Sequence, residues 1–221
     1  MIDKKTYLKL KRKYGLCSSW AVWIPEGDTP KSNTGDMSWL KDPDLLEILN
    51  TGFIFVGLNC AGTHGDQSDG GRIAWKNFHS DYSRQNDYKI RYALKGTRYW
   101  GSYITDIIKD FPEVDSGKVK QYLKANQEIV EANITEFKKE ISCLGDDPVL
   151  VAFGDEVYRI LTAFLGDEYR ITKVPHYSHY IGKEEYRKQI LNKLKGYKVY
   201  KDQYENCVIE NRKDHGTSEP E

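Results

Sequence analysis

Two short segments, far apart in the sequence, place polar side chains directly after apolar runs. The run Phe53-Ile54-Phe55-Val56-Gly57-Leu58 ends at the uncharged amide of Asn59. Downstream, the amphipathic stretch 170–174 delivers His176 and Ser178 into a loop. In an open parallel α/β sheet, ligands bind and chemistry takes place at the carboxyl ends of the strands. The sequence therefore predicts one active-site crevice formed by these two strand-end loops.

The rest of the chain supplies the elements that would position this crevice. Apolar runs at 101–109 and 148–154 predict two more buried strands, the first with Thr105 and Asp106 near its end. Strands that alternate with helices predict a three-layer α/β/α fold around a short four-stranded parallel sheet. Helices are expected at 4–14, from an N-cap at Asp42 to Gly52, near 87–94, over 119–144, over 157–165 with Asp155 as N-cap, and at 183–194.

We expect one domain with two additions. Residues 1–52 read as a helical and loop extension packed on the core, 53–200 as the core itself, and 201–221 as a polar tail whose last ten residues are disordered. The polar, Gly-rich stretch that follows Asn59 up to Gly71 is long for a compact domain, and loops of this length are usually functional or mobile.

Composition limits the partners and the compartment. Lys and Arg together number 33, as do Asp and Glu, so no global field draws the protein to nucleic acid, and any such contact needs a local patch. No stretch approaches the roughly 20 apolar residues that span a bilayer, and the charged N-terminus is not a signal peptide. We therefore expect a cytoplasmic monomer without a membrane partner.

The sequence favours neither a metal nor another cofactor. The cysteines are widely spaced and lack a C-x-x-C pair, which is typical of reduced thiols. His64, Asp66, Asp69 and His79 form an alternative metal cluster, but their irregular spacing in a Gly-rich stretch favours a solvated loop.

Four motifs together resemble the uracil-DNA glycosylase superfamily in order, spacing and chemistry over about 53–194. They are Gly57-Leu58-Asn59-Cys60-Ala61, Thr105-Asp106 with Lys109, Val151-Ala152-Phe153-Gly154, and His176-Tyr177-Ser178. In the mismatch-specific and single-strand-selective members, the first motif has the form Gly-hydrophobic-Asn-Pro-Gly and its Asn positions the attacking water. The last motif there is His-Pro-Ser or Asn-Pro-Ser.

The resemblance implies the uracil-DNA glycosylase fold and a DNA glycosylase without a metal. Such an enzyme hydrolyses the N-glycosidic bond of a damaged or deaminated base in DNA, including single-stranded DNA. Cleavage needs a positioned water, a donor for the oxygen that gains charge, and an aromatic surface for the flipped base. The implied roles are Asn59 for the water, His176 for the leaving base, Asp106 for reading the base, Phe78 or Trp75 for stacking, Ser178 for a phosphate, and His179, Tyr180 and Ile181 as wedge residues. Lys173, Lys183, Arg187 and Lys188 are candidate phosphate contacts.

The chain departs from the family pattern at three positions. Cys60 and Tyr177 replace the two prolines, and Asp106 replaces the Asn of a Thr-Asn pair that reads uracil. An ionised Asp only accepts hydrogen bonds, so a charged Asp106 favours a base with an exocyclic amine. If burial keeps Asp106 protonated, it mimics the Asn and uracil again becomes the ligand.

Two other functions and a structural interpretation stay open. The first is a non-catalytic module that binds a nucleobase, a nucleotide or a protein partner, and the second is a glycosidase for free nucleosides or nucleotides. Alternatively, Asn59 stabilises a turn, His176 packs in its loop, and Asp106 caps a helix or pairs with Lys109. For Phe78 and Trp75, the sequence favours ordinary core positions over stacking surfaces.

Overall fold

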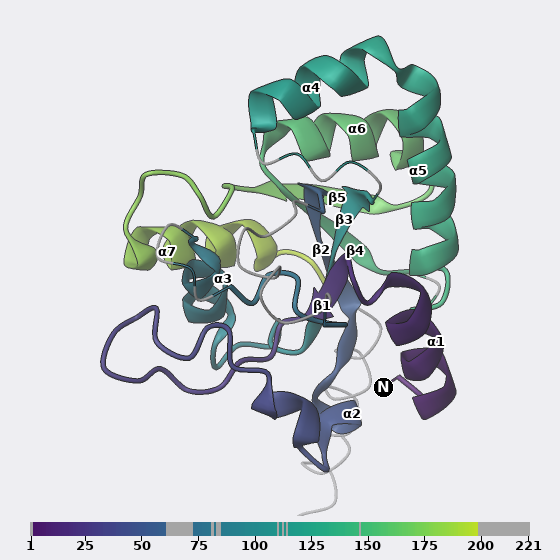
Figure 1. The fold of residues 1–221 in the computed structure, drawn as a ribbon. Helices are drawn as coiled ribbons and strands as arrows, with labels where there is room; N and C mark the ends of the chain where they lie inside the picture. Colours follow the sequence, from purple (N-terminus) through teal and green to yellow (C-terminus); the bar gives the residue numbers. More distant parts are fainter. Residues whose placement is uncertain are drawn as a thin grey trace, which may run out of the picture.

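A mixed five-stranded sheet forms the centre of the molecule (Figure 1). The computed structural model describes residues 2–60, 73–80, 82, 85–109, 111, 113, 115–145 and 147–198. The strand order is β1-β3-β2-β4-β5. β2 pairs in parallel with β3 and β4, β4 pairs in parallel with β5, and β1 is antiparallel to β3. The strands are β1 (Ser18–Trp20), β2 (Asn50–Asn59), β3 (Ser102–Ile108), β4 (Val149–Phe153) and β5 (Arg170–Val174).

The expected α/β class is confirmed, but the expectation of a purely parallel four-stranded sheet is wrong because it lacks β1. This strand has three residues, all buried, and its sequence is too short and too polar to show a strand pattern. Its hydroxyls are satisfied in the core, since Ser18 Oγ donates to Tyr14 O and Ser19 Oγ to Trp75 O. Residues 1–52 therefore complete the sheet as well as packing on it.

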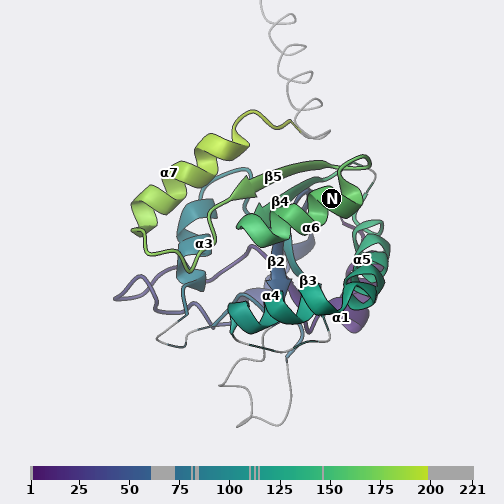
Figure 2. The same cartoon turned by 90° about the horizontal axis from the view of Figure 1, so that it is seen from above.

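Helices cover both faces of the sheet, as the view from above shows (Figure 2). One face packs against apolar side chains of α1, α4, α5 and α6, and the other against those of α3 and α7. The bounds are α1 (Lys4–Tyr14), α2 (Leu45–Ile48), α3 (Asp87–Leu94), α4 (Ser116–Ala125), α5 (Gln127–Ile141), α6 (Asp155–Leu165), α7 (Lys183–Leu194) and a 3-10 turn η1 (Ser38–Lys41). None of the helices in these ranges is long and apolar enough to cross a bilayer.

Local chemistry explains where the helices differ from expectation. The predicted helix over 119–144 is two helices, because Asn126 leaves helical geometry at φ −132° and ψ 71° and its amide donates to Tyr122 O. Asp155 is the first residue of α6 and not its N-cap, a position taken by Gly154 at φ +90°. The N-cap of α2 is likewise Asp44 and not the predicted Asp42. The Asp42 carboxylate instead accepts a hydrogen bond from the Asp44 N–H, before the helix begins.

Two segments of the sequence expectations lie outside the described residues. These are the Gly-rich segment 61–72, with His64, Asp66 and Asp69, and the tail 201–221. Among the described residues, no group of three or more His, Cys, Asp or Glu side chains is arranged to hold a metal ion.

Candidate functional site

The strand order creates a topological switch point beside Asn59. The chain passes from β2 to β3 on one side, crosses to β4 on the other side, and then continues outward to β5. The connections after β2 and β4 thus leave in opposite directions, which is the arrangement that opens a binding crevice at the carboxyl ends of strands. Asn59 ends β2, Gly154 follows β4, and His176 lies two residues after β5.

Asn59 has a clear structural partner at this edge. Its Nδ2 donates to the backbone oxygens of Phe111, at 3.0 Å, and Glu113, at 2.7 Å, and so holds the loop that follows β3. Both amide hydrogens are used, which leaves Oδ1 to accept a hydrogen bond from water. The structure thus gives Asn59 the loop-stabilising role that an Asn at a strand end often has, and keeps the acceptor that water positioning needs.

Asp106 lies directly opposite Gly57, and its carboxylate approaches so closely that position 57 requires a glycine. A Cβ atom on Gly57 would lie 2.1 Å from Asp106 Oδ1 and 3.2 Å from the Phe78 ring, so only glycine admits both neighbours. The Asp106 carboxylate is buried and accepts from Asn77 Nδ2 at 2.8 Å. Burial raises its pKa to about 7, against the lowering effect of the Asn77 hydrogen bond. Near neutral pH, Asp106 is therefore divided between acid and carboxylate.

Phe78 and Trp75 are three residues apart but lie on opposite faces of the sheet. Both have left-handed backbones, at φ 65° and 72°, which bulky residues rarely adopt. Trp75 is fully buried among Tyr7, Trp20 and Tyr103 on the α1 side, so the interpretation of Trp75 as a stacking surface for a base is corrected.

Phe78 does lie at the switch point. Its ring is 6.4 Å from that of Phe153 and 6.2 Å from that of Tyr177, on the same face of the sheet as Asp106. Phe78 is 5% exposed, so neighbouring side chains cover its ring in this structure.

His176 is held in one neutral tautomer by its own loop. Its Nδ1 accepts the Ser178 N–H at 3.1 Å and lies 2.7 Å from Ser178 Oγ, which requires the ring proton to sit on Nε2. Burial, aided by the positive charges of His179 and Lys120, lowers the pKa of His176 to about 4. At physiological pH the imidazole is an uncharged donor through Nε2–H. Ser178 thus orients His176, a role that sequence reasoning did not foresee.

Tyr177, the residue between His176 and Ser178, turns inward. Its ring stacks on His176 with centroids 4.3 Å apart and contacts Phe153 edge-on at 5.4 Å. Burial, together with the charges of Asp87 and Asp106, raises the pKa of Tyr177 well above its usual range. The half-buried ring therefore lines the site. We call Gly57, Phe78, Asp106, Phe153, His176 and Tyr177 the switch-point cluster.

The other residues that the sequence analysis assigned to DNA contacts differ in how exposed they are and in how far they are paired within the protein. His179 and Tyr180 are exposed, Tyr180 completely, as wedge residues would need to be. Arg187 uses part of its guanidinium within the protein, since Nη1 donates to the carbonyl oxygens of Tyr92, Ala93 and Lys95 at the end of α3. Among the described side chains, Asn59 makes no hydrogen bond or ring contact with His176, although both lie at the same edge.

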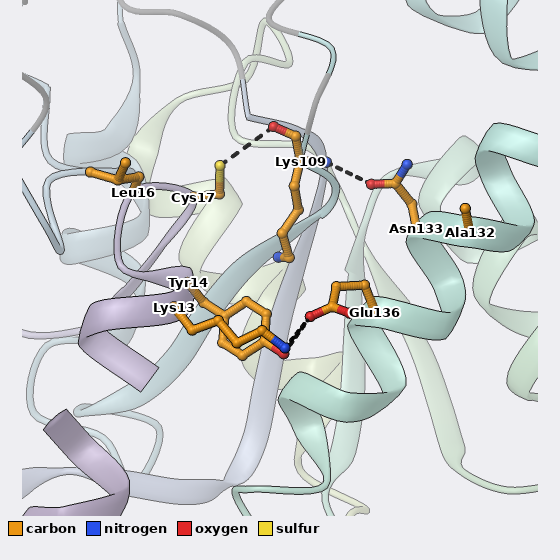
Figure 3. A pocket seen from close by; sticks show the side chains of 8 residues that line it. All are labelled: Lys13, Tyr14, Leu16, Cys17, Lys109, Ala132, Asn133 and Glu136. Atoms are coloured by element: carbon orange, nitrogen blue, oxygen red, sulfur yellow. Dashed lines mark hydrogen bonds and ion pairs between the residues drawn. The ribbon is translucent and has the colours of Figure 1, made fainter. Parts of the chain in front are cut away.

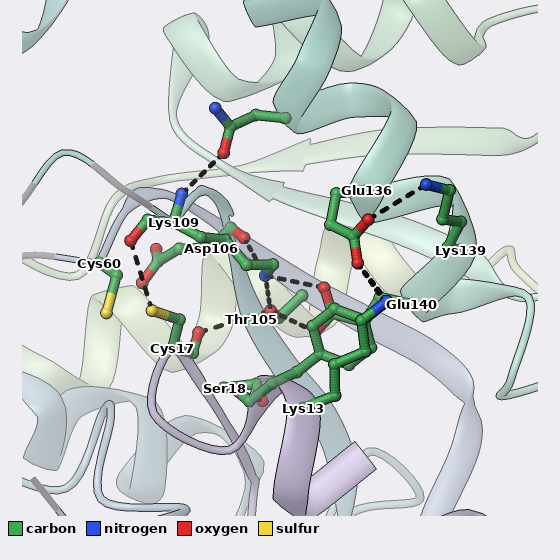
Figure 4. A network of polar contacts seen from close by, with 12 residues as sticks. Lys13, Cys17, Ser18, Cys60, Thr105, Asp106, Lys109, Glu136, Lys139 and Glu140 are labelled. Carbon is green, nitrogen blue, oxygen red and sulfur yellow. Dashed lines mark hydrogen bonds and ion pairs between the residues drawn. The ribbon is translucent and has the colours of Figure 1, made fainter. Parts of the chain in front are cut away.

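A cavity of about 530 Å³ lies on the opposite side of β3 (Figure 3). Its charged groups are paired within the protein: Lys13 with Glu136, and Lys109 with Glu140 at 2.7 Å. Lys109 Nζ also contacts Thr105 Oγ1 at 2.9 Å and Asp106 O at 2.7 Å (Figure 4). The cavity is lined by Lys13, Tyr14, Leu16, Cys17, Lys109, Ala132, Asn133 and Glu136.

Cys60 follows Asn59 but is not placed as a nucleophile. The residue is buried, its N–H donates to Ile108 O at 2.9 Å, and its Sγ faces Leu16 O at 3.4 Å. This environment suits a small apolar thiol that packs in the protein interior.

No protein-family model, curated protein or solved structure matches the chain.

Proposed function

We propose that the chain is an N-glycosyl hydrolase of the DNA glycosylase type, acting on a damaged or deaminated base. The observation that carries the proposal is the neutral imidazole of His176, fixed by Ser178 so that Nε2–H is its donor, at the edge where β2 ends in Asn59. Phe78 and Asp106 supply an aromatic surface and a polar group on the adjoining strand. The order of the strand-end motifs supports assignment of the fold to the uracil-DNA glycosylase type.

The proposed reaction needs no charged catalyst. Water attacks the sugar carbon and releases a proton to solvent, the N-glycosidic bond breaks, and its electrons leave with the base, which then takes up a proton from solvent. Asn59 Oδ1 accepts a hydrogen bond from the attacking water, and His176 Nε2–H donates to the base atom that gains negative charge. A neutral donor is suited to this, because it stabilises the anionic base without giving up its proton first.

Asp106 reads the base in this proposal. With a pKa raised to about 7 by burial, its carboxyl group is both acid and carboxylate in the physiological range. The acid form donates and accepts in the way an Asn amide does, and the carboxylate only accepts. Base preference is thus set by which form Asp106 takes beside the ligand.

The alternative is a binding module without catalysis, and two observations favour it. Both amide hydrogens of Asn59 are committed to the 111–113 loop, and the ring of Tyr177 takes up space against Phe78. A module of this kind would bind a nucleobase or nucleotide at the same cluster but leave the glycosidic bond intact.

Oligonucleotide cleavage separates the two functions. Single- and double-stranded DNA carrying uracil, hypoxanthine, xanthine, mismatched thymine, 5-hydroxycytosine or 8-oxoguanine would be incubated with the protein and then treated with alkali. We expect breakage at one base, reduced about 10²- to 10³-fold by His176→Ala, the loss typical of a missing donor to a developing anion.

Asn59→Ala should also abolish the cleavage, and Asn192→Ala, on an exposed part of α7, should retain it. Intact DNA at every base and at high protein concentration would contradict the enzyme and favour the binding module.

A further inference from the structure

The outer face of α1 carries a concentration of positive charge that the proposed reaction does not use. The helix has six Lys and Arg side chains among its 11 residues and no acidic residue, although the whole chain has no net charge. A surface groove of about 560 Å³ lies on this helix, and the described residues that line it are all exposed: Lys4, Lys5, Leu8, Lys9 and Arg12. We call these five residues the basic face of α1.

Helical spacing brings the side chains of the basic face together. Residues three or four positions apart are neighbours on a helix surface, so Lys5 lies beside Lys9, and Lys9 lies beside Arg12. The same periodicity puts the buried residues of α1 on the opposite side of the helix, where they pack into the core: Tyr7, Leu10 and Tyr14. The core therefore fixes the orientation of α1 and leaves its basic face on the surface.

The charge of this face is not neutralised within the described part of the protein. Lys13, on another side of α1, pairs with Glu136, but none of the four cations of the basic face forms an ion pair with a described carboxylate. Lys9 Nζ instead contacts Cys143 Sγ at 3.4 Å. Asp3 is the N-cap, and its carboxylate accepts from two backbone N–H groups of the first turn. Like charges at helical spacing repel one another, and a bound polyanion would remove that repulsion.

The end of α1 lies beside the edge of the sheet that holds the proposed site. Directly after α1, Leu16 O faces Cys60 Sγ at 3.4 Å, and Gly15 O accepts from the Trp75 N–H at 2.7 Å. Cys60 follows Asn59, so the chain leaves α1 next to the end of β2. The helix lies beside β1 at the side of the molecule and is about 16 Å long (Figure 1). It thus offers several positive charges to a strand that extends from the switch-point cluster.

The chemistry of the basic face fits a nucleic acid backbone better than a membrane or a protein. A helix that lies on a membrane inserts its apolar side, but the apolar side of α1 is buried in the core. Protein interfaces are depleted in Lys and depend on aromatic anchors, whereas Leu8 is the one apolar side chain among the described residues of the groove. Exposed Lys and Arg side chains are the groups that neutralise phosphates.

We propose that the basic face of α1 binds the sugar–phosphate backbone of the DNA strand that enters the switch-point cluster. This inference rests on the proposed function for the identity of its ligand, but it does not require that the glycosidic bond is cleaved. Lys5, Lys9 and Arg12 contact phosphates and do not read the sequence. They hold the strand on α1 while one of its bases reaches the switch-point cluster.

Fluorescence anisotropy with a dye-labelled, undamaged oligonucleotide, single-stranded or duplex, tests this binding from about 50 to about 200 mM salt. The triple variant Lys5→Gln/Lys9→Gln/Arg12→Gln should bind at least about tenfold more weakly at the lowest salt. Its slope of log K against log salt should be smaller by about 2 to 3, because each phosphate contact contributes about 0.7 for a single strand and about 0.9 for a duplex. Thermal unfolding should be unchanged or shifted upward, since glutamine is a good helix former and the repulsion is removed.

The charge-matched control is Lys193→Gln/Lys195→Gln/Lys198→Gln. These exposed lysines lie at and beyond the end of α7, which packs on the opposite face of the sheet from α1. The control should bind the oligonucleotide with the affinity and the salt slope of the wild type. If the α1 variant unfolds, the single variant Lys9→Gln decides, with an expected decrease in slope of about 0.7 to 0.9.

No DNA binding by the wild type, or the same affinity and salt slope in the α1 variant, would overturn the proposal. An equal loss in both triple variants would do so too, because it would show a response to net charge alone. Binding to phosphatidylserine vesicles that depends on the basic face, without DNA binding, would assign the face to a membrane and also overturn it. DNA binding through α1 without cleavage of any oligonucleotide would reject the enzyme and keep the basic face. Cleavage with unchanged DNA affinity in the α1 variant would reject the basic face alone.

Discussion

The two faces of β3 near its carboxyl end carry comparable polar side chains in opposite conditions. On the face toward α5, Glu140 is paired with Lys109 and accepts from Tyr103 and Thr105, both at 2.8 Å (Figure 4). On the face toward α3, Asp106 accepts one hydrogen bond from the described side chains, from Asn77. Thr105 and Asp106 are adjacent in β3, but Thr105 belongs to a network whose polar groups pair with one another, which we call saturated. Asp106 belongs to a group of side chains with few hydrogen bonds, which we call unsaturated.

The difference shows where a ligand is needed. Buried polar groups that satisfy one another stabilise a single conformation and gain little from a ligand. Groups that burial leaves short of partners gain free energy when a ligand supplies them. By this criterion the switch-point cluster is the better candidate site, although a cavity of about 530 Å³ lies beside the saturated Lys109 network.

The largest effect should come from breaking the saturated network. Lys109→Met would leave Glu140 charged and buried without its counterion, and should lower the free energy of unfolding by about 3–5 kcal/mol. Urea denaturation measures the loss, and the double variant Lys109→Met/Glu140→Leu should recover most of it. A loss below about 1 kcal/mol for Lys109→Met, the range of exposed ion pairs, would show that the network is not a stabilising unit.

Gly57→Ala should have the next largest effect, because it disturbs the side chains on the face of β3 that carries Asp106. The new Cβ would collide with Asp106 Oδ1 and crowd Phe78, which should lower the free energy of unfolding by about 1–3 kcal/mol, as overpacking does. Nucleoside binding should fall with it because the carboxylate is displaced. Gly196→Ala is the matched control, since its Cβ would meet no atom within 4 Å. Wild-type binding by Gly57→Ala would remove Asp106 from the site.

Asp106→Asn should change how stability depends on pH. Burial raises the pKa of Asp106 in the folded chain to about 7, above its ordinary value of 3.8. Between these values the folded chain keeps a proton that the unfolded chain has released, so the contribution of this group falls as pH rises from about 4 to about 7. The variant should therefore lose less stability than the wild type over this range, as measured by urea midpoints. Parallel profiles would mean that Asp106 is not buried as an acid.

The smallest effect is expected at Ser178. Ser178→Ala removes the hydroxyl beside His176 Nδ1 but keeps the backbone N–H that fixes the tautomer. Any cleavage activity should fall only about three- to tenfold, the worth of one ordinary hydrogen bond. Single-turnover cleavage on the substrate identified above measures this. A loss as large as that of His176→Ala would indicate that Ser178 acts on the substrate itself.

Much of the fold could be predicted, because apolar runs mark β2, β3 and β4, an amphipathic pattern marks β5, and α1, α3 and α7 follow clear helical spacing. β1 could not, since three residues carry no periodicity and its pairing with β3 is a tertiary choice. The break at Asn126 was hidden by a continuous apolar pattern across α4 and α5.

The site was harder to predict than the fold. Strand-end positions indicated Asn59, Asp106 and His176, but not that Phe78 and Trp75 would diverge through two left-handed residues. Asp87 and Tyr186 have no signal of their own, because one begins a helix and the other fits the apolar face of α7. The burial of both side chains becomes visible only in the packing of α3 on α7.

The most direct test of the central claim is to map amide chemical shifts while deoxycytidine is added to the ¹⁵N-labelled protein. Binding at the switch point should perturb the amides of Gly57, Asn59, Asp106, Gly154 and Tyr177, and leave those lining the cavity between α1 and α5, such as Lys13, Ala132 and Glu136, near their starting positions. Perturbations centred on that cavity, or none at saturating nucleoside, would contradict the assignment of the ligand site to the unsaturated face of β3.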